Sequence, residues 1–102
     1  MYRSTTPELI FHVTNEDIDM SKIAICHVTV ESADYSHKII YENPEIDVEN
    51  RLIKQFMTQA ETLSFNAGTV LIQLKVKLEN GSVIPSKIMT RSMKEILEEA
   101  EL

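Results

Sequence analysis

The sequence predicts a mainly β protein, an antiparallel immunoglobulin-like β-sandwich of about seven strands with one short helical turn and a short C-terminal helical tail. Two observations carry this prediction. Apolar residues alternate with polar ones at period two, in segments that recur about every ten residues. The 102 residues are also the length of one domain, so we expect residues 1–102 to form a single unit. A partly open barrel is the alternative, because periodicity does not encode contacts between distant strands.

The first half of the chain predicts five short strands. Residues 8–14 alternate around Leu9, Phe11 and Val13. Residues 22–31 carry apolar side chains on both faces near their start, which is typical of a central strand covered on two sides. Shorter strands follow over residues 37–42, 46–48 and 51–57.

A single helical turn is expected after the fifth strand. Thr58 is followed three residues later by Glu61, which is the pattern of a capping box. In that motif each side chain accepts a hydrogen bond from a backbone N–H that the start of a helix leaves unpaired.

The strongest local prediction is a hairpin over residues 69–93. Residues 69–79 place Val70, Ile72 and Leu74 on one face at strict alternation. Asn80-Gly81 follows, and this pair favours a type I′ turn into a return strand over residues 82–93. Because proline cannot donate to a ladder, we expect a bulge or an edge position near Pro85 and Ser86.

The tail, residues 94–102, is rich in strong helix formers and in glutamate. Ile96, Leu97 and Ala100 could form a stripe at helical spacing. A helix this short is marginal alone and needs a surface to dock on. We therefore take Ile96, Leu97 and Leu102 as candidate protein-interaction residues, and we expect removal of residues 94–102 to weaken assembly while the core stays folded.

The charge balance argues against several classes of partner. The net charge is −6, and the lysines and arginines are scattered singly among sixteen acids. A duplex-binding protein normally shows a basic stripe, so we expect no nucleic-acid partner and no anionic membrane. The first residues lack the apolar segment of a signal peptide, and no apolar run approaches the roughly 20 residues that span a bilayer. We expect synthesis in the cytoplasm.

The side chains that could do chemistry do not form a site in the sequence. Cys26 lies in an apolar run, where a lone thiol fills core space, and Cys26 and His27 point to opposite faces of one strand. His12 and His27 could face each other if the first two strands pair, but zinc needs three or four ligands. The acidic run 15–19 lacks the glycine and distal glutamate of a calcium loop and favours a turn with Asx capping.

Catalysis is therefore not expected. Gly68 and Gly81 are the two glycines, so no glycine-rich phosphate loop exists in this sequence. Glu98 and Glu99 lie in the tail without a pocket that would raise the pKa of either. We predict no catalytic, cofactor-binding or metal-binding residues, no cofactor and no small-molecule substrate.

The C-terminal half resembles a known group of proteins. The matching residues run from Phe56 to Phe65, from Gly68 to Val76, over Asn80-Gly81-Ser82-Val83 and Ser86-Lys87-Ile88, and over Ile96 to Glu99. They are similar to small β-sandwich proteins of about 100 residues in phages and prophages of Gram-positive bacteria, which look like the sandwich domains of phage tails and baseplates. Pro85 and Ala60 depart from that pattern.

The resemblance implies a non-enzymatic phage structural or assembly protein, a virion or tail-associated component. Its partners would be other structural proteins of the phage or further copies of this chain, so an oligomer is expected, and its final location would be the virion. A second hypothesis is an acidic binding module that inhibits a host protein, since the negative charge would steer it to a basic partner.

Overall fold

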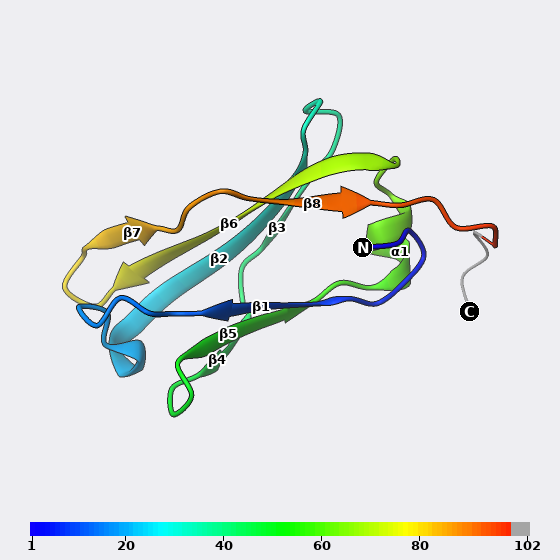
Figure 1. Cartoon of the computed structure of the whole chain (residues 1–102). Helices are drawn as coiled ribbons and strands as arrows, with labels where there is room; N and C mark the ends of the chain where they lie inside the picture. Colours follow the sequence, from blue (N-terminus) through cyan, green and yellow to red (C-terminus); the bar gives the residue numbers. More distant parts are fainter. Residues whose placement is uncertain (99–102) are drawn as a thin grey trace.

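The computed structural model describes residues 1–98, which fold into two antiparallel β-sheets (Figure 1). The elements in chain order are β1 (Glu8–His12), a 3₁₀ turn η1 (Met20–Lys22), β2 (Ile23–Ser32), β3 (Lys38–Tyr41), β4 (Glu45–Asp47), β5 (Leu52–Phe56), α1 (Gln59–Leu63), β6 (Gly68–Leu78), β7 (Val83–Pro85) and β8 (Met89–Met93). The mainly β prediction is confirmed.

The two sheets are separate in their pairing. One has the order β1-β5-β4, and the other has the order β3-β2-β6, with β7 and β8 both paired to the far side of β6. Within residues 1–98 no strand pair joins one sheet to the other. The sheets share one core, to which Phe11 and Ile53 contribute from the small sheet and Val28, Val30 and Ile72 from the large one.

Strand β6 matches its prediction closely. Its alternation buries one face, made of Val70, Ile72, Leu74, Val76 and Leu78, and leaves Lys75 and Lys77 exposed. Strand β2 differs from its prediction. Cys26, Val28 and Val30 are buried, but 48% of Ile25 is exposed on the opposite face. The expectation of a strand covered on two sides was wrong, because β2 is central within its sheet but no other element of residues 1–98 covers its outer face.

The hairpin turn also differs from the prediction. Gly81 has φ +90°, but Asn80 is not among the residues with positive φ, and a type I′ turn needs both. The Leu78 carbonyl accepts from the Gly81 N–H, and the Leu78 N–H donates to the Ser82 carbonyl, each at 2.9 Å. This is a type I turn followed by a glycine bulge, which gives the hairpin a three-residue loop.

The return strand is interrupted next to Pro85, as predicted. It is divided into β7 and β8, and Ser86, between them, makes hydrogen bonds to both the N–H and the carbonyl of Leu74. The Ser86 N–H donates to the Leu74 carbonyl at 2.7 Å, and the Ser86 Oγ accepts from the Leu74 N–H at 2.9 Å. Pro85 lies on the edge of the sheet, so the predicted edge position is confirmed.

The capping box at α1 is confirmed. The Thr58 Oγ1 accepts from the Glu61 N–H at 3.1 Å, and the Glu61 Oε1 accepts from the Thr58 N–H at 2.8 Å. The acidic loop before η1 also matches its prediction, because Asn15 and Asp19 each accept a backbone N–H two residues further on, at 3.0 Å.

The predicted helix over residues 94–102 is absent from its described part. Lys94 forms an isolated parallel bridge with Tyr2, and residues 95–98 are not helical. The Lys94 N–H donates to the Met1 carbonyl and the Lys94 carbonyl accepts from the Arg3 N–H, so Lys94 extends the line of β8 beside residues 1–3 and does not begin a helix. Residues 99–102 lie outside the described part of the chain.

Candidate interaction surfaces

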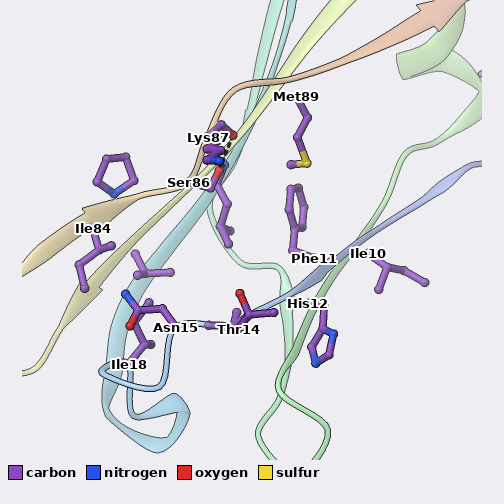
Figure 2. A pocket seen from close by; sticks show the side chains of 14 residues that line it. Ile10, Phe11, His12, Thr14, Asn15, Ile18, Ile84, Ser86, Lys87 and Met89 are labelled. Carbon is purple, nitrogen blue, oxygen red and sulfur yellow. Dashed lines mark hydrogen bonds between the residues drawn. The ribbon is translucent and has the colours of Figure 1, made fainter.

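A slot opens into the core between the outer strands of the two sheets. Strand β1 forms one side, β7 and β8 form the other, and the slot has a volume of about 590 Å³. Figure 2 shows Phe11 of β1 and Met89 of β8 pointing toward one another across it. A second hollow lined by Leu9, Ile72 and Arg91 shares Ile10, Phe11 and Met89 with the first, so the slot continues along the length of β1.

Strands β1 and β8 each have an edge that pairs with no other strand of residues 1–98. The Pro7 carbonyl and the Val13 N–H bond toward β5 and its flanks, so the odd-numbered residues of β1 aim their backbone at β5. The N–H and C=O groups of Ile10 and His12 therefore aim at the slot. On β8 the Ser92 carbonyl accepts from the Met1 ammonium at 2.7 Å, so even-numbered residues such as Thr90 aim away from β6.

Arg51 holds the loop that closes one end of the slot. Its side chain donates to three carbonyls, those of Val13 at 3.0 Å, Asn15 at 2.8 Å and Ile18 at 3.0 Å. Arg51 has φ +55°, a conformation that a side chain disfavours by about 1 kcal/mol. The three hydrogen bonds offset this strain and fix residues 13–18, several of which line the slot.

On the β7 side of the slot, one edge position lacks a backbone N–H because it is occupied by Pro85. Ser82 and Ser86 bond toward β6, so the intervening Pro85 faces outward on the edge of β7. Because proline has no N–H, this part of the edge cannot form a full set of backbone hydrogen bonds with an added strand. Strand β1 and the Thr90 N–H of β8 therefore form the part of the slot where another strand could add, while the Thr90 carbonyl accepts from Arg91 Nη1 at 2.8 Å.

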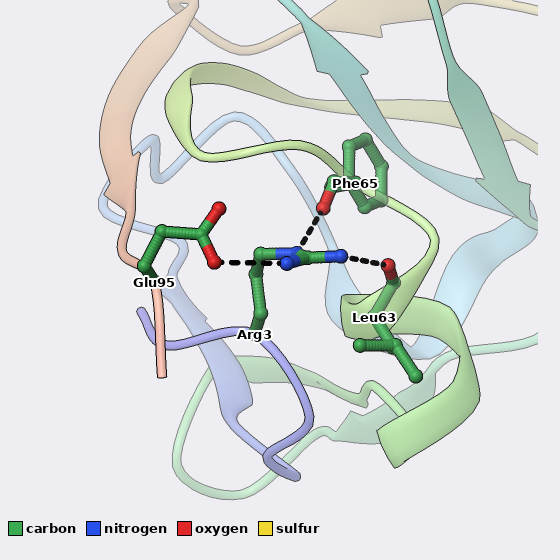
Figure 3. A network of polar contacts seen from close by, with 4 residues as sticks. All are labelled: Arg3, Leu63, Phe65 and Glu95. Carbon is green, nitrogen blue, oxygen red and sulfur yellow. Dashed lines mark hydrogen bonds and ion pairs between the residues drawn. The ribbon is translucent and has the colours of Figure 1, made fainter. Parts of the chain in front are cut away.

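The predicted contact residues of the tail lie in three different settings. Ile96 is half-buried, Leu97 is fully exposed, and Leu102 lies outside the described residues. The start of the tail is anchored by Arg3, as Figure 3 shows. Arg3 donates to the Phe65 carbonyl at 2.7 Å and the Leu63 carbonyl at 3.1 Å, and it pairs with Glu95 at 2.9 Å. Leu97 is thus presented from a fixed base.

Cys26 and the histidines do not form a site together. Cys26 is buried, and burial raises the pKa of its thiol to about 11. Strand β1 pairs with β5 and not with β2, so the expected approach of His12 to His27 was conditional on a pairing that does not occur. Within residues 1–98 no group of three or more His, Cys, Asp or Glu side chains could hold a metal ion.

One contact between chemically active side chains was missed by the sequence reasoning. His37 Nε2 lies 2.8 Å from the Ser64 Oγ, although the two residues are far apart in sequence. The Ser64 hydroxyl also donates to the Glu61 carbonyl, so Ser64 joins the residue before β3 to the end of α1.

The outer face of the large sheet carries a second surface, which we call the basic patch: Ile25, His27, Lys75, Lys77 and Val83. In the sequence these lysines look isolated among acids. The alternation of β6 does place Lys75 and Lys77 on one face, but their neighbours follow from strand pairing, which the sequence alone does not specify.

No family model, no curated protein and no solved structure matches this chain. The helices of residues 1–98 are too short or too polar to cross a bilayer.

Proposed function

We propose that this chain is a non-enzymatic structural or assembly protein of a phage or prophage, a virion or tail-associated component that works through protein–protein contacts. The observation that carries the proposal is the slot, an apolar cavity bordered by the edges of β1 and β8, which no other strand of residues 1–98 covers. An extended segment of another structural protein can add to such an edge, with backbone hydrogen bonds for affinity and apolar side chains for specificity. The resemblance of residues 56–99 to small phage proteins supports a role in phage assembly.

The proposed architecture is an immunoglobulin-like β-sandwich. Two antiparallel sheets around one shared core support it, as does a small sheet of three strands opposite a large one. In this arrangement an incoming strand would lie between β1 and β8 and contact Phe11 and Met89. Synthesis in the host cytoplasm followed by incorporation into the particle completes the proposal.

The first experiment is mass spectrometry of phage particles purified from the bacterium that carries this gene. We expect the protein in a fixed ratio to other particle proteins. Its absence from the particles, together with recovery on one host protein, would overturn the proposal in favour of an inhibitor.

The slot is tested by Ile10→Pro. The Ile10 N–H aims at the slot, so proline removes a donor from the open edge without removing a bond to β5. We expect normal folding by circular dichroism and reduced incorporation into particles. The matched control is Leu9→Pro, which removes a ladder bond to β5 and should lower the thermal midpoint. Normal incorporation of a folded Ile10→Pro protein would contradict the role of the slot.

A further inference from the structure

The basic patch lies at the end of the large sheet that is remote from the tail. Lys77 lies opposite Ile25 on one side and Val83 on the other, and Lys75 lies opposite His27 and Pro85. Together these side chains line a shallow hollow of about 240 Å³. About half of the surface of Ile25 and of Val83 is exposed. The patch thus offers two cations and two apolar side chains side by side.

The positive charge of the patch is not neutralised by its surroundings. The ion pairs of residues 1–98 involve neither Lys75 nor Lys77. Glu79 directly follows β6, and its N–H donates to the carbonyl of Lys22, which brings a further cation to that end. On a chain with a net charge of −6, this surface fits a short segment that combines carboxylates with large apolar residues.

We propose that the basic patch binds residues 97–102 of a second copy of this chain. That segment reads Leu-Glu-Glu-Ala-Glu-Leu, so it combines three carboxylates with two leucines. Leu97, at its start, is fully exposed and its base is anchored through Arg3 and Glu95. The inference rests on the proposed role in assembly, but it uses a surface other than the slot.

The dimensions exclude the chain's own segment as the occupant. Met93 lies opposite Gly68, and the two lysines lie seven to nine residues further along β6. At about 3.3 Å per residue this separation is roughly 23–30 Å. Residues 97–102 reach about 20 Å when fully extended. They also start beyond the end of β8, on the side away from the patch (Figure 1). The segment must therefore come from another copy.

This contact joins unlike surfaces, since each copy offers one patch and one acidic segment. Such heterologous contacts propagate, and they close into a ring or continue as a filament according to the rotation between copies. The contact is small, so we expect association that grows with concentration and weakens with salt.

Light scattering on the full-length chain over a wide concentration range tests the inference. We expect a mass that rises above 11.7 kDa with concentration in low salt. Lys75→Glu combined with Lys77→Glu should weaken association at least about tenfold, because two attractions become repulsions. The control, Lys54→Glu with Lys87→Glu, changes the net charge equally outside the patch and should associate normally. Loss of association in the control alone would move the contact to the slot and overturn the inference.

Charge reversal on the segment completes the test. Glu98→Lys, Glu99→Lys and Glu101→Lys together should abolish self-association, and a chain that carries both sets of reversals should regain it. Mixing the patch variant with the segment variant should restore association, with the two variants alternating, since the intact segment fits the intact patch and the reversed segment fits the reversed patch. A wild-type chain that stays monomeric at millimolar concentration overturns the inference. If that monomer is still found in purified particles, the proposed function stands without it.

Discussion

Cys26 shows what burial does to a single reactive side chain. Only 4% of its surface is exposed, on the inner face of β2 opposite Val76. Removal of the thiolate from water raises the pKa of the thiol to about 11 from an ordinary value of 9.0. At neutral pH the side chain is therefore a neutral thiol that packs as a small apolar group.

We predict that native Cys26 resists alkylation at pH 8 and reacts rapidly once urea unfolds the chain. Because its folded-state pKa is raised, its contribution to stability is complete below about pH 9 and is lost as the pH rises toward 11. Urea unfolding at pH 8 and pH 10.5 should show a larger loss for the wild type than for Cys26→Val. Equal losses in the two proteins would contradict this assignment.

Tyr41 also makes the folded state less stable as the pH rises, at higher pH than Cys26 does. Burial raises the pKa of its phenol, and the nearby Glu61 carboxylate raises it further. Its hydroxyl oxygen is buried without a hydrogen-bond partner among the described atoms. The Cys26→Val protein should thus retain part of the alkaline sensitivity, and this remainder belongs to Tyr41.

At the scale of elements, the β6–β7 turn is the clearest case for substitution. Gly81 has φ +90°, and nothing lies within 4 Å of where a Cβ would be, so strain is the main effect of a side chain. We predict that Gly81→Ala lowers the free energy of unfolding by about 1 kcal/mol. Gly81→Asn should lower it less, because asparagine tolerates left-handed backbone. Denaturant melts measure both, and an unchanged Gly81→Ala protein would contradict the glycine bulge.

The elements also show which features can be predicted from the local sequence pattern. Alternation predicted β6 within one residue at each end, and Thr58 with Glu61 predicted the start of α1. The turn type was missed because Asn80-Gly81 fits two hairpin geometries, which differ in the φ of Asn80 and in whether the loop has two residues or three. The slot could not be predicted, because it depends on β1 pairing with β5 and on β7 and β8 sharing β6. The same is true of the basic patch, whose apolar members come from β2 and β7.

At the scale of the whole molecule, the chain ends are part of one network. Met1 and Arg3 bond to Ser92 and Lys94, and Arg3 links Glu95 to the end of α1. This changes the interpretation of the tail. Residues 94 and 95 belong to the folded domain, and the segment available for docking begins near Leu97.

We predict different outcomes for two truncations. A chain that ends at Ile96 keeps the Lys94 and Glu95 contacts and should melt at the wild-type temperature. A chain that ends at Met93 loses them and should lose about 1–3 kcal/mol of stability, because the Arg3 guanidinium loses its carboxylate and backbone groups lose partners. Thermal melts followed by circular dichroism compare the two. Equal midpoints would show that the end network contributes nothing.

The parallel pairing of the chain ends has a mechanical consequence. Residues 1–3 and 92–95 run in the same direction, so a pull on residue 1 against residue 95 slides one segment along the other. The three backbone hydrogen bonds and the Arg3–Glu95 pair then resist together, whereas an antiparallel end would unzip one bond at a time. The chain ends therefore resist a pull along their length more strongly than an antiparallel pairing of the same residues would.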